Sequence, residues 1–437
     1  SAFIKPYVPY GLNDWGQVTG HGYGDVNDER AHPYMYNPGG PNEFICLGDM
    51  DTVCDFTRGG NGYAINNSGW VTGRNSQRTV ESYYRAFYWH DDNNDGLSNP
   101  GEMRNLEATR PNYISYGWGM NNLGNVAGSS YYSDDYGSYR EGWIWKDANG
   151  NSDYDEGEKI RLGDYIPRDI NDAGQVVMGG PGDTAYRWTD INENGVVDLG
   201  EAAQIPNIYD GGTQESIDAI NRRGQVAGSI RNVWDKKQGF LWTDANRDNV
   251  VDAYEMQTFG HMFYMSHIRG MNDIGQIVGG TYAFTPLHPN DGDRKAFVWD
   301  PVKGLRDLTT LVDYEVPGMG QFQMSQAEGI NNRGQIIAVG EFDGYDPGPG
   351  IYHRDDFAVI LSGPAVQVCQ TFLQGQRIQE DLGWSVGEED GDTVVELFED
   401  SDETVLRLAD EGTEGSDAVS VSRRLNLGED YTVQFDY

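Results

Sequence analysis

The chain has 437 residues, and its 31 basic and 69 acidic side chains give a formal charge of −38 at neutral pH. This charge argues against a nucleic-acid partner, because phosphate contacts need patches of lysine and arginine. Apolar residues make up 38% of the chain, enough for a packed core. No apolar run approaches the ~18 residues of a membrane-spanning helix. The 58 glycines indicate a turn-rich, all-β protein.

A ten-residue pattern recurs seven times, in copies such as GLNDWGQVTG and GMNDIGQIVG. Asparagine is favoured at the first position of a type I turn, and the glycine three residues later suits the left-handed backbone that closes such a turn. Each copy therefore predicts a tight hairpin between two strands. The shared asparagines are Asn13, Asn66, Asn121, Asn171, Asn221, Asn272 and Asn331.

Each unit then contains an aromatic strand, as in Ala86-Phe87-Tyr88-Trp89, and a fourth short strand, as in Arg161-Leu162-Gly163-Asp164. Four short strands in about 50 residues is the period of a β-propeller blade. The sequence therefore predicts a seven-bladed β-propeller over residues 1–363, with an open solenoid as the alternative. The tryptophans at the shared repeat position are expected in the core: Trp89, Trp145, Trp188, Trp242 and Trp299.

The seventh unit runs into Ser362-Gly363-Pro364 after its third strand and has no local fourth strand. We expect residues Phe3 to Val8 to supply that strand and lock the ring. Residues Val366 to Phe372 are the alternative.

Through its Ala-Phe-x-Trp strands and Asn-x-x-Gly-x-Val-x-Gly turns, the chain resembles the extracellular HAF-repeat proteins of bacteria. Arg85 and Lys295 replace the histidine of that repeat in the two clearest copies. The resemblance implies a secreted, propeller-like array, and it implies no particular activity.

Units two to five carry a twelve-residue acidic insertion after the aromatic strand, starting at Asp91, Asp147, Asp190 and Asp244. The pattern is that of an EF-hand-type loop, which supplies oxygen ligands to calcium from positions 1, 3, 5, 7, 9 and 12. Position 7 contributes its backbone carbonyl, and position 9 (Asn99, Asp155, Asp198 and Asp252) often acts through water. The other expected ligands are Asp91, Asn93, Asp95, Leu97 and Glu102; Asp147, Asn149, Asn151, Asp153 and Glu158; Asp190, Asn192, Asn194, Val196 and Glu201; and Asp244, Asn246, Asp248, Val250 and Glu255.

Position 6 of such a loop needs a left-handed backbone, which Gly96 and Gly195 adopt freely and Asn249 tolerates. Ser152 fits least well, so the loop at Asp147 is expected to be the weakest site. Strand-like segments flank all the loops, so an opening-helix switch is not expected. The sequence predicts about four calcium ions with a structural role, which fill where calcium is plentiful.

Further ligand contacts are expected from aromatic side chains in loops, namely Tyr131, Tyr136 and Trp70, which can stack on sugars or pack on a partner. Packing within a soluble loop is the alternative. Cys46 and Cys54 are close enough in sequence for a disulfide, which leaves Cys369 unpaired.

Residues 364–437 are more acidic and contain alternating segments, such as Thr393-Val394-Val395-Glu396-Leu397-Phe398. They predict a β-sandwich-like segment, one that is incomplete because the chain stops inside its last predicted strand. The order of these strands resembles the sandwich modules near the C-termini of some exported bacterial surface proteins.

No nucleophile elbow, zinc signature or phosphate loop is present, and the seven histidines share no repeat position. We therefore predict that the protein is not an enzyme and has no catalytic residues. The expected function is that of a secreted, calcium-binding structural or protein-interaction module of an extracellular or cell-surface assembly, with other surface proteins or further copies of itself as partners. The alternative is a carbohydrate-binding propeller that recognises a polysaccharide, and a polysaccharide-active enzyme ranks below it.

Overall fold

The structure is a computed structural model of the whole chain. It describes residues 5–362 apart from 24–30, 41, 49–58, 77–83, 107–112, 135–136, 156, 182–183, 199, 206–212, 232–236, 260–263, 284–292, 312–314, 317–319 and 343–356. Beyond residue 362 it describes 393–400, 403–410 and 432–434.

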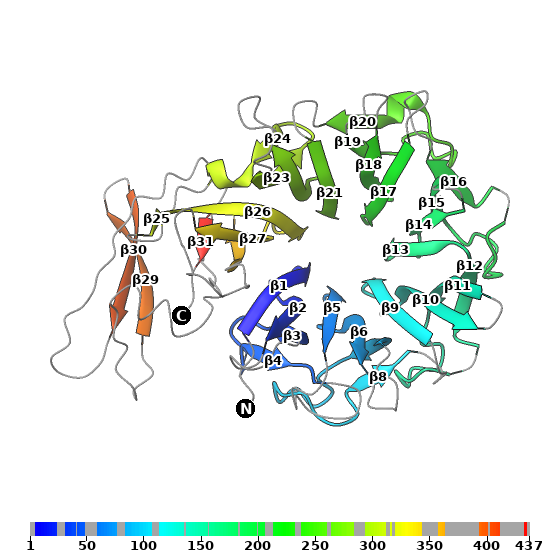
Figure 1. Ribbon diagram of the computed structural model, residues 1–437, viewed down its shortest axis with the longest axis horizontal. Coiled ribbons are helices and arrows are strands. Elements are labelled where there is room, and N and C mark those ends of the chain that lie inside the picture. Colours follow the sequence, from blue (N-terminus) through cyan, green and yellow to red (C-terminus); the bar gives the residue numbers. More distant parts are fainter. Residues whose placement is uncertain are drawn as a thin grey trace.

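Seven antiparallel sheets surround one axis and form a β-propeller, with the first strand of each repeat innermost (Figure 1). The described residues include no α-helix, and none of their helices is long and apolar enough to cross a membrane. The first six blades are β1 (Lys5–Leu12), β2 (Val18–Tyr23), β3 (Ala31–Tyr36), β4 (Phe44–Cys46); β5 (Gly60–Ile65), β6 (Val71–Ser76), β7 (Tyr84–Trp89), β8 (Met103–Asn105); β9 (Tyr113–Met120), β10 (Val126–Asp134), β11 (Gly137–Trp145), β12 (Lys159–Gly163); β13 (Ile166–Ile170), β14 (Val176–Gly180), β15 (Thr184–Trp188), β16 (Ala202–Ile205); β17 (Thr213–Ile220), β18 (Val226–Arg231), β19 (Lys237–Trp242), β20 (Met256–Phe259); and β21 (Tyr264–Met271), β22 (Ile277–Ala283), β23 (Asp293–Asp300), β24 (Gly304–Asp307).

The seventh blade combines β25 (Glu315–Val316), β26 (Gly320–Ile330), β27 (Ile336–Phe342), β28 (Phe357–Ser362) and β31 (Thr432–Gln434). Two 3₁₀ turns, η1 (Ala253–Glu255) and η2 (Leu308–Leu311), complete the propeller. The expected seven-bladed architecture is confirmed.

The ring does not close as expected. The segment from Lys5 to Leu12 pairs with β2 and is the innermost strand of blade one, because the strand before each asparagine turn takes the inner place in its blade. The outer strand of blade seven is β31, which pairs Ser362 with Thr432. Our assignment of Phe3 to Val8 to the seventh blade is therefore wrong, and Val366 to Phe372 lies outside the described residues.

The core lies between neighbouring blades, where the aromatic strands pack face to face. Trp89, Trp145, Trp188 and Trp242 are at most 1% exposed and Trp299 is 7% exposed, as expected for core residues. The side chain before each tryptophan packs against the tryptophan of the next blade, as Tyr88 does on Trp145. Blades are thus held together by large apolar contacts along the middle of each sheet.

In the C-terminal segment the structure describes a two-stranded antiparallel hairpin, β29 (Thr393–Asp400) and β30 (Glu403–Asp410). The segment predicted from Thr393 to Phe398 lies within β29, and the β-sandwich itself stays a prediction. Cys46 is disulfide-bonded, whereas Cys54 and Cys369 lie outside the described residues.

Candidate functional site

The seven asparagine turns meet at the axis and are joined in a ring of hydrogen bonds. Each asparagine side-chain amide donates to the backbone carbonyl of the asparagine in the next blade, over 2.9–3.2 Å. The last of these bonds runs from Asn331 to Asn13 and closes the ring. The side-chain oxygen of each accepts backbone N–H groups of its own turn, as Asn121 does from Leu123 and Asn125. The turn glycines have φ between 74° and 85°, the left-handed backbone that the sequence predicts.

The residue after each asparagine forms a second ring around the same axis. Its side chain accepts the backbone N–H of the equivalent residue in the preceding blade, as Asn67 does from Asp14. Blade five has Arg222 at this place, and its Nε donates to Asp172 at 3.0 Å. Burial raises the pKa of Asp14, but hydrogen bonds from Asn332 and Asn67 outweigh it and leave that pKa lowered. These turns line an axial cavity of about 220 Å³.

Deeper along the axis, every innermost strand contains a β-bulge three residues before its asparagine. At that point the pairing between the first and second strands of the blade shifts by one residue. One residue of the first strand therefore has no cross-strand partner. A bulge bends the strand and re-aims that side chain. The bulge residues, in blade order, are Tyr10, Tyr63, Trp118, Arg168, Asp218, Arg269 and Glu328.

These bulge residues contact one another from blade to blade. Tyr63 lies 5.4 Å from Tyr10 and 5.1 Å from Trp118 between ring centroids, and the Arg168 guanidinium lies 5.3 Å from the Trp118 ring. On the other side of the axis, Arg269 pairs with Glu328 at 3.4 Å. The set of bulge residues therefore has an aromatic half and a half of alternating charge.

Burial raises the pKa of Asp218 and Tyr10, two of the bulge residues. It raises the pKa of Asp218 to about 6, against the opposing effects of the Ser216 hydroxyl and of Arg168 and Arg269. Burial and the nearby Glu328 raise the pKa of Tyr10 to about 12. The bulge residues were not among the predicted site residues, although they share a fixed offset from the repeat asparagine.

The four acidic loops lie on the same face as the asparagine turns, because alternate hairpins of an antiparallel sheet share one edge. In the first three, the position-1 aspartate accepts the backbone N–H of position 6, over 2.9 Å at Gly96, 2.8 Å at Ser152 and 3.0 Å at Gly195. Position 6 is left-handed in all four loops, with φ between 60° and 72°. The backbone therefore adopts the conformation that the calcium pattern requires at this position.

The glutamate at position 12 is buried in each loop, with 4–8% of its surface exposed in Glu102, Glu158, Glu201 and Glu255. One carboxylate oxygen of each accepts the backbone N–H of position 2. None of the four pairs with a lysine or arginine among the described residues, and Glu201 Oε2 is buried without a partner. A buried carboxylate without a cation is costly, so this residue set fits a bound cation.

Within the described part of the chain, no group of three or more His, Cys, Asp or Glu side chains is arranged to hold a metal. A calcium ion in these loops would therefore also use asparagine and backbone oxygens, as hard oxygen ligands allow.

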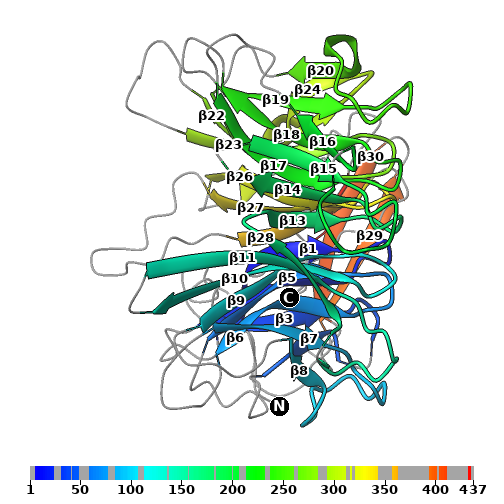
Figure 2. The same cartoon turned by 90° about the vertical axis from the view of Figure 1, so that its right-hand side faces the viewer.

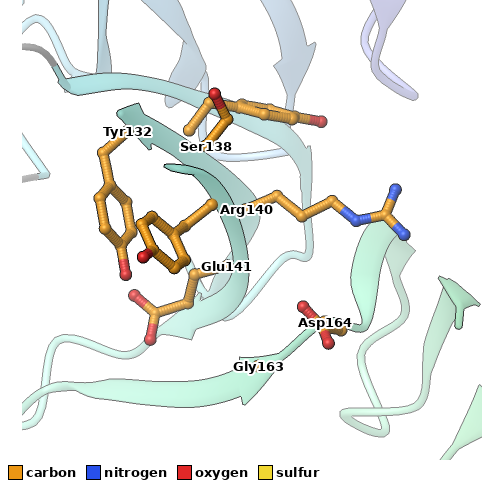
Figure 3. A pocket seen from close by; sticks show the side chains of 8 residues that line it. Tyr132, Ser138, Arg140, Glu141, Gly163 and Asp164 are labelled. Atoms are coloured by element: carbon orange, nitrogen blue, oxygen red, sulfur yellow. The ribbon is translucent and has the colours of Figure 1, made fainter. Parts of the chain in front are cut away.

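A separate cavity of about 590 Å³ lies beside the long β10–β11 hairpin, which extends past its neighbours (Figure 2). Tyr132 stacks on Tyr139 at 5.0 Å between ring centroids, and Tyr131, Tyr132 and Tyr139 are 36–40% exposed. Figure 3 shows Tyr132 and Glu141 on one side and Arg140 and Asp164 on the other. The full lining is Tyr131, Tyr132, Ser138, Tyr139, Arg140, Glu141, Gly163 and Asp164.

Of the expected ligand contacts, Tyr131 lines this cavity and Tyr136 lies outside the described residues. Trp70 lies in an asparagine turn, at the opposite ends of the strands, and packs on Tyr88 and His90 at 4.6 and 5.1 Å. The structure therefore does not bring Tyr131 and Trp70 into one site.

No protein-family model matches the chain, and no curated protein matches it either. Among solved structures, a prolyl endopeptidase is similar with a TM-score of 0.51 and 9% identity, over 93% of this chain and 55% of that one. An acylaminoacyl peptidase of Pyrococcus horikoshii gives a TM-score of 0.48 at 10% identity, over 94% and 59%. The propeller domain of the trilobed protease of Pyrococcus furiosus gives 0.39 at 12% identity, over 77% and 91%.

The likeness to the prolyl endopeptidase contradicts our prediction that the protein is not an enzyme. The chain spans about half the length of the prolyl endopeptidase, so a chain of this architecture can be part of a peptidase. We had inferred the absence of an enzyme from the lack of catalytic motifs in the repeats, and that inference fails because a catalytic site need not lie in the blades. At this identity the likeness shows the fold alone. The chain is an all-β, seven-bladed β-propeller.

Proposed function

We propose that the chain is a calcium-stabilised β-propeller that acts as an interaction or structural module outside the cell. The observation that carries the calcium part is the buried glutamate at position 12 of the first three acidic loops, held by backbone N–H groups and without a basic partner. A divalent cation would neutralise these carboxylates and join the two ends of each loop.

The chain's own residues define what such an ion would contact. In the first loop Asp91, Asn93, Asp95 and Glu102 supply side-chain oxygens and Leu97 its carbonyl. The amide of Asn93 lies 3.1 Å from an Asp95 oxygen, so side chains of positions 3 and 5 already converge. Each bound ion would offset two units of the formal charge of −38.

Three observations support an extracellular setting. Loops of this kind in extracellular modules bind calcium at roughly 10⁻⁴–10⁻³ M, a range that fills only where calcium is plentiful. A disulfide at Cys46 is typical of oxidising compartments. The resemblance to secreted HAF-repeat proteins favours the same location.

Calcium binding is testable by isothermal titration of the chelator-treated protein. We expect saturable binding with a dissociation constant in the range of about 10⁻⁴–10⁻³ M. Magnesium should bind far more weakly, because it demands a tighter octahedral shell. A titration without heat or saturation up to about 10 mM calcium, well above this range, would contradict the proposal.

The tyrosine cavity favours a second candidate function, carbohydrate binding. Exposed aromatic rings beside Arg140, Glu141 and Asp164 offer stacking surfaces together with hydrogen-bond donors and acceptors, the combination that sugar rings require. The cavity volume of about 590 Å³ lies within the usual range for a small-molecule ligand.

A glycan array probed with the wild type and with Tyr139→Ala tests this candidate. Loss of one stacked ring is expected to weaken binding about tenfold or more. Tyr254→Ala is the matched control, because Tyr254 is 72% exposed on the face of the acidic loops. Absence of any glycan signal from the wild type in calcium would rule the candidate out.

A further inference from the structure

The fourth acidic loop differs from the other three because it already contains a buried cation. Arg187, on β15, forms an ion pair with Asp244, position 1 of that loop, at 2.5 Å, and the two side chains are 6% and 10% exposed. The same guanidinium donates to the Asn249 side chain at 2.9 Å and to the Gly224 carbonyl at 3.0 Å. It also lies 4.3 Å from the Trp242 ring centroid.

This arrangement changes the role of position 1. In loops one to three one carboxylate oxygen of position 1 accepts the backbone N–H of position 6, and the other accepts the N–H of position 5. In loop four Asp244 Oδ2 accepts the guanidinium instead, and Oδ1 is buried without a partner. The side chain at position 6, Asn249, is also drawn to Arg187.

At the place of Arg187, the blades that precede the other three loops carry uncharged side chains. Arg104 pairs with Asp92 of loop one and, at 3.5 Å, with Asp153 of loop two, but among the described residues it pairs with position 1 of neither loop. Arg187 is the second-last residue of its aromatic strand, and the equivalent residue of each preceding blade lies beside the tryptophan that ends the aromatic strand of the next blade. Beside loop one Met35 belongs to the same core cluster as Trp89, beside loop two Tyr88 packs on Trp145, and beside loop three Ile144 belongs to the same core cluster as Trp188.

We infer that the Arg187 guanidinium occupies the cation position of loop four, so that the propeller binds three calcium ions and not four. The inference rests on the proposed calcium binding of loops one to three. A fixed positive charge beside position 1 repels a divalent ion and removes one of its ligands. Arginine stays charged at all working pH values, so the replacement is permanent.

Counting bound calcium tests the inference, by equilibrium dialysis of the full chain at saturating calcium followed by elemental analysis. The wild type is expected to hold three ions per chain. Glu158→Gln should remove one ion, and Glu255→Gln, the same change in loop four, should remove none. Arg187→Ile, which copies the residue beside loop three, should add a fourth ion, and Ile144→Arg should remove the ion of loop three.

Four ions in the wild type, with one lost in Glu255→Gln, would overturn the inference and leave the proposed function intact. No bound calcium at all would overturn the proposed function and the inference together. If Arg187→Ile does not fold, the paired glutamine variants, which leave the Arg187 contacts in place, still decide between three ions and four.

Discussion

Replacing Asn121 by alanine is expected to lower the free energy of unfolding by about 3 kcal/mol, because the change leaves several buried polar groups unpaired. Asn121 is 3% exposed. Its amide joins blade three to the carbonyl of Asn171 in blade four at 3.0 Å. Its oxygen accepts the N–H groups of Leu123 and Asn125. Denaturant unfolding followed by tryptophan fluorescence measures the loss.

Asn121→Asp separates the bond between blades from the bonds within the turn. Aspartate keeps an oxygen for the turn but places a second oxygen against the Asn171 carbonyl, so this variant should also be clearly destabilised. Leu123→Ala is the matched control in the same turn, because Leu123 is 70% exposed. An Asn121→Asp protein as stable as the wild type would show that the asparagine ring does not hold the blades together.

Calcium is expected to raise the melting temperature of the propeller by roughly 10 °C relative to chelator. At about fifty times its dissociation constant, one ion stabilises the folded state by about 2 kcal/mol, so three ions contribute about 6 kcal/mol. The triple variant Glu102→Gln, Glu158→Gln, Glu201→Gln keeps an oxygen at position 12 but loses the charge at the three loops. Differential scanning calorimetry in about 5 mM calcium, above the expected dissociation constants, and in chelator measures the response.

The triple variant should melt at nearly the same temperature in both conditions. Glu255→Gln should keep the full calcium response, because the Arg187 guanidinium already pairs with Asp244 and takes the place of the ion in loop four. An unchanged response in the triple variant would assign the stabilisation to sites other than the acidic loops.

The parts of this fold that depend on local sequence could be predicted. The asparagine and the glycine of each turn lie within four consecutive residues, so the motif alone predicts the hairpin. The left-handed backbone at Gly124 is an example. Burial of the repeat tryptophans follows from their size and shared position, and Trp89 is fully buried. The left-handed position 6 of the acidic loops was predictable for the same local reason.

The features that the sequence did not reveal depend on contacts between blades. The bulge at Trp118 arises from a register slip against β10, which no local pattern specifies. Arg187 reaches a loop that begins 57 residues later, so its role appears only once two blades lie side by side. The partner of β28 is equally non-local, since it comes from Thr432–Gln434, and this is why the closing strand was assigned wrongly.

The most direct test of a calcium-stabilised propeller is an anomalous difference map from crystals grown in calcium. The account predicts one peak in each of the loops at Asp91, Asp147 and Asp190, close to the glutamate at position 12. At Asp244 it predicts the Arg187 guanidinium and no peak. Well-ordered loops without any anomalous peak would contradict the account.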